Sequence, residues 1–159
     1  MSSRFVPIKV AAAMGSAIVG GVLFAFSTFV LKALDRLPPS QSITAMQAIN
    51  KAAPNIWFMT VLFGTALACV TLAVTAVIDW RKPGAIHRLV GGVLYLLAVA
   101  ITVTYHVPHN DALATVDPAG IDVAHRWAAY LSGWTAWNHV RAISSIAGAT
   151  ILTLGLRAT

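Results

Sequence analysis

Long runs of apolar residues, separated by short polar segments, dominate the pattern along the chain. Three of these runs are as long as a membrane-spanning helix, which needs about 20 consecutive apolar residues. A fourth run, 142–156, reaches spanning length only if the more polar segment 134–141 extends it. The pattern therefore predicts four helical spans, at about residues 10–31, 56–78, 89–105 and 135–156.

Two longer connections join these spans on one side, and both have helical character. Ile43, Met46 and Ile49 share one face of a short predicted helix, and residues 118–133 show a similar spacing. Pro108, which has no backbone N–H, is expected to end the third span. Residues 1–159 are thus expected to form a single all-α membrane domain. Its predicted architecture is an up-down-up-down four-helix transmembrane bundle with short extra helices in two long external loops.

The composition agrees with a membrane protein and excludes several other classes. The chain is 58% hydrophobic and only 10% charged, whereas soluble domains average about 25% charged residues. The single cysteine, Cys69, excludes an intramolecular disulfide and a cysteine-rich metal site. Although the formal net charge is +6, the basic residues lie at the ends of apolar runs. They therefore indicate membrane orientation, and no nucleic-acid partner is expected.

The distribution of basic residues predicts how the spans are oriented. One side carries six of them in three short segments: Arg4, Lys9, Arg81, Lys82, Arg88 and Arg157. The other side carries five in two longer loops: Lys32, Arg36, Lys51, Arg126 and Arg141. Since short cytoplasmic segments are enriched in Lys and Arg, both termini are expected in the cytoplasm, with the protein in the plasma (inner) membrane.

Polar side chains, which are costly in lipid, gather at the external ends of the spans. Four of the five histidines and all four asparagines lie on that side. His106 and His109 have a spacing compatible with a transition metal, since imidazole is a common metal ligand. They are only weak metal candidates, because the surrounding sequence supplies no third ligand.

A second polar cluster lies where the fourth span begins. On a helix, Trp134, Asn138, Arg141 and Ser145 fall on one face, and His139 lies about 100° round from Asn138. One interpretation is that Arg141 extends outward to the interface, among tryptophans of an interfacial belt. The other is that these groups line a site. We favour the site, because small residues on the same face are typical of a bundle interior.

At these residues the sequence resembles the small four-helix membrane family that includes the anthrone oxygenases. The matching segments lie in the same order along nearly the whole chain: residues 45–50, Pro54-Asn55, Phe58-Met59, Gly64, residues 107–114, Trp127, Tyr130, Trp134 and Trp137-Asn138-His139-Val140-Arg141. In the family pattern, asparagine usually stands at the position of His106 and an aliphatic residue at that of His109. Metal binding by these two histidines is therefore not implied by the resemblance.

The resemblance implies O2-dependent oxidation of an anthrone-like or other polycyclic phenolic substrate to a quinone, without a tightly bound cofactor. Such a substrate must lose a proton, for which histidine is a suitable base, and the oxyanion formed requires a hydrogen-bond donor. We therefore expect His139 to act as the base and Arg141 and Asn138 as donors. The expected substrate contacts are Asn110, Asn50, Trp137, Trp127, Tyr130 and His106, the last also a substitute base.

Two alternatives remain open at this level. A haem- or metal-binding redox protein would need histidines facing each other at similar depth, a requirement that His106 and His139 could meet. A non-enzymatic membrane carrier or assembly partner would use the same polar groups to join loops to helices. The partners expected are a small hydrophobic aromatic molecule, O2 and the lipid bilayer, and a homo-oligomer is compatible with the many small residues.

Overall fold

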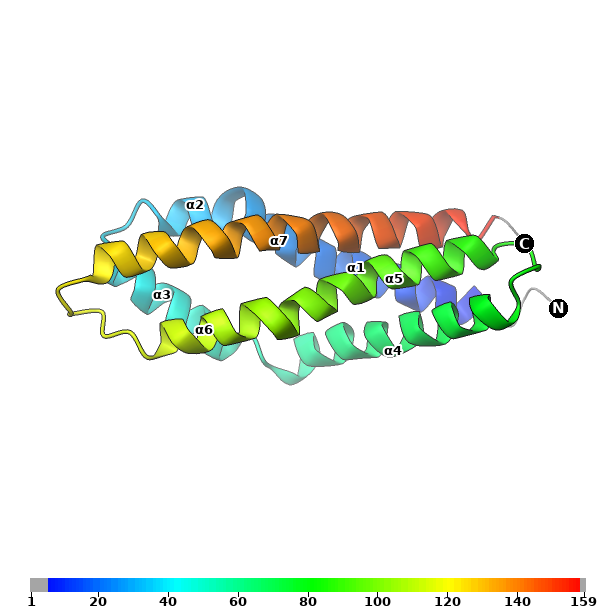
Figure 1. The fold of residues 1–159 in the computed structure, drawn as a ribbon, viewed down its shortest axis with the longest axis horizontal. Helices are drawn as coiled ribbons and strands as arrows, with labels where there is room; N and C mark the ends of the chain where they lie inside the picture. Colours follow the sequence, from blue (N-terminus) through cyan, green and yellow to red (C-terminus); the bar gives the residue numbers. More distant parts are fainter. Residues whose placement is uncertain (1–5, 158–159) are drawn as a thin grey trace.

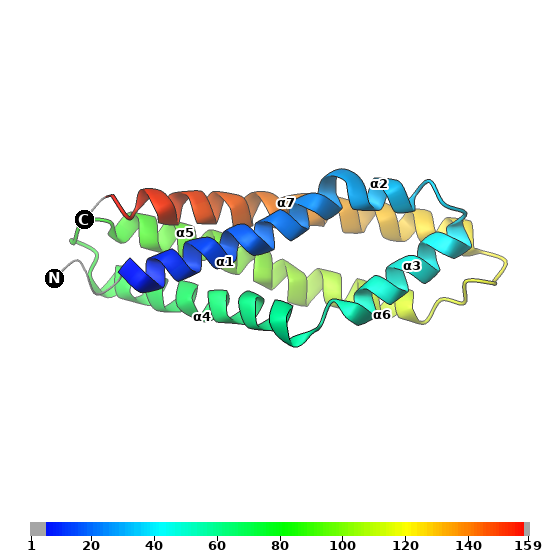
Figure 2. The same ribbon diagram turned by 180° about the vertical axis from the view of Figure 1, so that it is seen from behind.

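The computed structural model describes residues 6–157, which are helical apart from turns and short loops (Figure 1). Arg4, one of the residues used to predict orientation, lies outside the described residues. The long helices run roughly side by side (Figures 1 and 2). In chain order the elements are α1 (Val6–Ala25), the π-helix η2 (Phe26–Val30), α2 (Leu31–Leu34), α3 (Pro39–Ala52), α4 (Ile56–Ile78), α5 (Ala85–Ile101), the π-helix η3 (Thr102–His106), α6 (Val107–Ala114) and α7 (Val123–Leu154).

Three helical segments of the described chain are long and apolar enough to cross a membrane: Val6–Leu34, Ile56–Ile78 and Ala85–Ala114. The protein is therefore an integral membrane protein. The fourth long helix, α7, has 32 residues and is less apolar because it carries the polar cluster around Arg141. It nevertheless packs along α1 and α5, so that its polar face lies inside the molecule.

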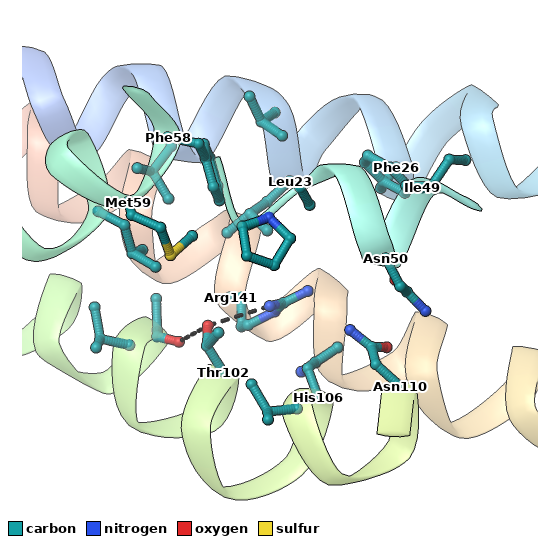
Figure 3. A pocket seen from close by; sticks show the side chains of 18 of the residues that line it. Leu23, Phe26, Ile49, Asn50, Phe58, Met59, Thr102, His106, Asn110 and Arg141 are labelled. Atoms are coloured by element: carbon teal, nitrogen blue, oxygen red, sulfur yellow. Dashed lines mark hydrogen bonds between the residues drawn. The ribbon is translucent and has the colours of Figure 1, made fainter. Parts of the chain in front are cut away.

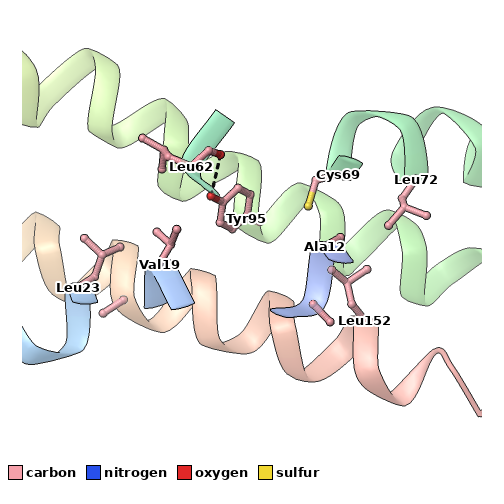
Figure 4. Close-up of a cluster of buried hydrophobic side chains, with 10 residues drawn as sticks. Ala12, Val19, Leu23, Leu62, Cys69, Leu72, Tyr95 and Leu152 are labelled. Atoms are coloured by element: carbon pink, nitrogen blue, oxygen red, sulfur yellow. Dashed lines mark hydrogen bonds between the residues drawn. The ribbon is translucent and has the colours of Figure 1, made fainter. Parts of the chain in front are cut away.

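The packing of the long helices depends on small residues at their contacts. α7 packs against α1 and α5, and α4 packs against α5 and α1. A Cβ atom on Gly148 would lie 2.9 Å from the carbonyl oxygen of Gly91, so a side chain there would push α7 and α5 apart. Beside this contact, Tyr95 is fully buried in the apolar core and its hydroxyl donates a 3.0 Å hydrogen bond to the carbonyl of Leu62 (Figure 4).

A buried lysine connects α1 to the end of α7, at the end of the molecule that holds both chain termini. The ammonium of Lys9 donates a 3.2 Å hydrogen bond to the carbonyl oxygen of Gly155, which follows the last turn of α7. A cation is favourable there because the carbonyl groups at a helix C-terminus carry partial negative charge. The contact fixes the start of α1 against the end of α7.

Pro108 does not end the third long helix as expected. The chain remains helical through it, because α5 passes into the π-helix η3 and then into α6, where Pro108 lies in the first turn. In a regular α-helix the proline ring would collide with the carbonyl group four residues earlier. In the wider π-helical turn the carbonyl group four residues before Pro108 takes a different position relative to the ring. The same turn lets Thr102 and His106 face the interior of the molecule.

Candidate functional site

A pocket of about 160 Å³ lies among the helices, near the loops at the end away from the termini (Figure 3). Side chains from α1, η2, α3, α4, α5, η3, α6 and α7 line it, and most of them are apolar. Its polar side chains are Asn50, Tyr95, Thr102, His106, Asn110 and Arg141. An apolar cavity with a few converging polar groups is the usual form of a small-molecule site.

Arg141 brings a positive charge to the wall of this pocket. It is only 5% exposed, and its guanidinium donates to Oγ1 of Thr102 at 3.1 Å and to Oδ1 of Asn138 at 2.6 Å. It also lies over the ring of Trp134, with 5.3 Å between Cζ and the ring centroid. Within the described part of the chain, no carboxylate pairs with it and its Nε atom is buried without a hydrogen-bond partner. A buried cation without a counter-charge is suited to bind an anion.

His106 contributes a buried imidazole to the wall of the same pocket. Its ring is fully buried, and Nε2 lies 3.2 Å from the carbonyl oxygen of Trp134. Since a carbonyl oxygen can only accept, we assign the proton of the neutral imidazole to Nε2, which leaves a lone pair on Nδ1. Among the described residues, Nδ1 has no hydrogen-bond partner. His106 is therefore a candidate proton acceptor.

Asn110 is held in one orientation by two donors. Its Oδ1 accepts hydrogen bonds from the Tyr130 hydroxyl and from Nε1 of Trp134, both of 2.9 Å. Because an indole N–H can only donate, the contacted atom must be the amide oxygen. Burial raises the pKa of Tyr130, so its phenol keeps the proton that it donates. The Asn110 amide nitrogen faces the pocket in Figure 3, and Asn50 lies opposite it with a buried, unpartnered Nδ2.

Four of the side chains predicted from sequence are brought together in this pocket: Asn50, His106, Asn110 and Arg141. They come from α3, η3, α6 and α7, so residues separated by up to 91 positions share one cavity. Tyr130 lies behind the pocket, where it holds Asn110. Trp127 lies further out, in a second apolar cluster, and its Nε1 donates to Oδ1 of Asp35 at 2.9 Å.

His139 and Trp137 do not line the pocket, which differs from the expectation that they share it with Arg141. His139 is exposed and lies in a separate surface crevice with Lys32 and Asp35. Trp137 is 44% exposed. The reason is geometric: successive residues of a helix are about 100° apart, so when Asn138 faces the interior both of its neighbours turn outward.

Asn138 is fully buried but lies beneath Arg141, outside the pocket lining. Its Nδ2 donates to the carbonyl oxygen of Leu23 and to Oγ of Ser27, both at 2.8 Å, and its Oδ1 accepts from Arg141. All polar atoms of this side chain are thus used within the protein. Asn138 is suited to hold Arg141 in place, and it has no free donor for an oxyanion.

Sequence reasoning did not select several residues that line the pocket. Trp134 is expected on the same helix face as Arg141 but not among the substrate contacts, yet it is buried and contacts His106, Asn110 and Arg141. Its place on the same helix face as Arg141 is the signal that could have identified it. Thr102 lies one helical turn before His106, but the apolar lining residues Phe58 and Met59 carry no comparable signal.

The described residues contain no group of three His, Cys, Asp or Glu side chains that could hold a metal ion. Nδ1 of His109 lies 2.7 Å from the carbonyl oxygen of Tyr105, and its ring stacks on that of Tyr105. His139, the other candidate haem ligand, lies outside the pocket that holds His106.

The family described as anthrone oxygenase matches residues 55–151, which is more than half of the chain. The matched segment begins at the residue before α4 and ends near the C-terminus of α7, so it contains His106, Asn110 and Arg141. Asn50, on α3, precedes it. No match to the chain is found among the curated proteins or the solved structures.

Proposed function

Because the chain belongs to the anthrone oxygenase family, we propose that it is a membrane enzyme that oxidises an anthrone-like or other polycyclic phenolic molecule with O2 to a quinone. The observation that supports this most directly is the pairing of Arg141 with His106 in one apolar pocket. Among the described residues, a buried cation without a carboxylate partner and an imidazole whose Nδ1 has no hydrogen-bond partner line the same pocket. That combination favours a substrate that becomes an anion on deprotonation.

In the first step, Nδ1 of His106 takes a proton from the CH2 group that lies opposite the carbonyl in the central ring. The electron pair left behind spreads onto the carbonyl oxygen, where Nε of Arg141 donates a hydrogen bond to the negative charge. Thr102 and Asn138 orient the guanidinium for this role. Since the donor is already in place before the reaction, little reorganisation is needed when the charge forms.

In the second step, the electron-rich enolate passes one electron to O2, and the two radicals combine into a peroxide anion at the carbon that lost the proton. This anion takes the proton back from His106 and becomes a hydroperoxide. Loss of water from the hydroperoxide then forms the second carbonyl group. The overall change is CH2 plus O2 to C=O plus H2O, so all four electrons that reduce O2 come from the substrate. The proposal accordingly includes no tightly bound cofactor.

This mechanism assigns the base to His106 and a positioning role to Asn138, in place of the roles expected from sequence for His139 and Asn138. His106 is supported because its side chain lines the pocket, whereas that of His139 does not. Asn138 holds the guanidinium from below, through its Oδ1. Trp134 covers one face of Arg141, and Asn110 supplies a second donor at the outer end of the pocket.

We also propose how the protein lies in the membrane. The four long segments cross the bilayer as an up-down-up-down bundle with both termini in the cytoplasm, in the plasma (inner) membrane. This orientation is supported by Arg81 and Lys82, which lie in the short turn at the end that holds the termini. The pocket then lies toward the outer side of the membrane.

The decisive experiment compares His106→Gln with His139→Gln in nanodiscs supplied with anthrone. The rates of O2 consumption and quinone formation are corrected by subtracting the background rates measured with empty nanodiscs. We expect His106→Gln to lower these corrected rates by about 100-fold or more. His139→Gln, which changes an exposed histidine, should keep the wild-type rate. Full activity in a folded His106→Gln protein would show that His106 is not the base.

A further inference from the structure

The pocket opens to the side, and residues at the start of α4 and at the start of α6 form the rim of this opening. Pro54, just before α4, and Val107, the first residue of α6, both line the pocket and are also exposed; Val107 is 45% exposed. Phe58, in the first turn of α4, is half-buried between them and the interior. Over their whole lengths, α4 packs mainly on α5 and α1, while α6 packs on η3, α3 and α7. Direct helix packing therefore does not close the wall between α4 and α6.

The position of this rim relative to the bilayer follows from α4. This helix has 23 residues. At 1.5 Å per residue it is about 34 Å long, close to the hydrocarbon core of a bilayer. Trp57 at its start is 80% exposed and Trp80 just after its end is also exposed, as expected for tryptophans at the two membrane interfaces. Because Pro54 and Phe58 flank Trp57 in sequence, the opening lies at the outer interface.

The chemistry of the lining favours a ligand that comes from lipid rather than from water. Among the described residues that line the pocket, Arg141 is the one Lys, Arg, Asp or Glu residue, and it lies in the interior. The rim residues Pro54, Phe58 and Val107 are apolar. A molecule passing between them thus exchanges one apolar environment for another until its acidic end reaches Arg141.

The size of the pocket supports the same conclusion. Its 160 Å³ is close to that of an engineered cavity of about 150 Å³ that holds benzene. A three-ring molecule is larger, so part of it extends toward the opening when its polar end contacts His106 and Arg141. The trailing rings would then lie against Phe58 and Met59, which line the opening side of the pocket.

We propose that Pro54, Phe58 and Val107 form a lateral mouth through which a flat, weakly acidic aromatic molecule dissolved in the outer leaflet enters the pocket. The choice of an aromatic acid rests on the proposed function, whereas the route from the membrane rests on the pocket itself. Val107 and Phe58 are accordingly selectivity-determining residues. Substrates made bulkier at the trailing ring, or carrying a charge there, are excluded at the mouth.

The test narrows the mouth and measures how fast a ligand associates. Val107→Phe adds bulk at the rim without adding a tryptophan. Its matched control is Val103→Phe, one turn earlier on the same helical segment, where the native side chain is 53% exposed but does not line the pocket. A second comparison is Val22→Phe on α1, since Val22 is the other well-exposed valine in the lining. The probe is 2-hydroxy-9,10-anthraquinone, a flat and weakly acidic phenol, in nanodiscs, and its binding is followed by quenching of tryptophan fluorescence in a stopped-flow instrument.

We expect Val107→Phe to slow association by about tenfold, while Val103→Phe and Val22→Phe keep the wild-type rate. If association slows in Val107→Phe but no protein oxidises anthrone, the mouth is supported and the proposed function fails. If anthrone is oxidised but Val107→Phe behaves like Val103→Phe, or if Val22→Phe is the slow variant, the mouth is wrong. Absence of quenching in the wild-type protein would also overturn it.

Discussion

Nη2 of Arg141 donates a 2.6 Å hydrogen bond to Oδ1 of Asn138, which lies one helical turn earlier on α7. The amide nitrogen of the same asparagine donates to the backbone of Leu23 and to the hydroxyl of Ser27 on the first helical segment. A single buried amide therefore connects the cation of the pocket to α1 and η2. The position of the guanidinium depends on the packing of two helices and not on α7 alone.

Replacing Asn138 by Ala should destabilise the protein. The change leaves buried polar atoms on Ser27 and Arg141 without partners, at a cost of about 1–3 kcal/mol each. The measurement is thermal unfolding in detergent, together with the KM for anthrone. Asn138→Asp is the informative companion, because its carboxylate would neutralise Arg141. We expect it to retain more stability than Asn138→Ala but to raise the KM, and an unchanged KM in both variants would contradict the positioning role.

Gly148→Ala should lower stability, because the new methyl group would lie 2.9 Å from the Gly91 carbonyl oxygen and α5 cannot yield without moving away from α7. The expected loss is about 1–3 kcal/mol, the usual cost of overpacking. Gly64→Ala is the matched control, since no atom of the described residues outside the nearby turns of its own helix lies within 4 Å of a Cβ at that position. There, the better helix propensity of alanine should leave stability equal or raise it by up to about 1 kcal/mol. Equal melting temperatures for the two variants would show that the close approach of α5 and α7 is not tight.

Cys69 should resist thiol reagents in the folded protein. Cys69 lies on α4, and its side chain is fully buried against the neighbouring helices. A maleimide can therefore react with it only after the helices separate. Labelling should therefore begin with thermal unfolding and not before it. Leu67→Cys in a Cys69→Ser background provides the control, because Leu67 is 69% exposed. Rapid modification of Cys69 under native conditions would mean that α4 separates from the other helices without global unfolding.

The proposed orientation can be measured with reporters that are active on one side of the membrane only. A fluorescent protein fused after Thr159 should fold and fluoresce, and alkaline phosphatase at the same place should be inactive. A phosphatase inserted at Gly120, in the loop between α6 and α7, should be active. The reverse pattern would place the pocket on the cytoplasmic side, and the basic residues would not have set the orientation.

Much of this protein follows from the sequence because it depends on local physical chemistry. The apolar run 56–78 is long enough to cross a bilayer, and it is helical over the same residues. Trp134, Asn138, Arg141 and Ser145 recur at helical spacing, and all four are buried on the inner face of α7. In both cases, neighbouring residues along one helix contain the whole signal.

Other features were decided only by the tertiary structure. The turn of α7 that brings Arg141 inward also carries His139 outward, and the π-helical turn before Pro108 turns His106 into the pocket. Periodicity along the chain defines which residues share a face of a helix. How far each helix is rotated about its own axis depends on the small residues and buried hydrogen bonds of its neighbours, so the identity of the histidine that faces Arg141 could not be obtained from one segment of sequence.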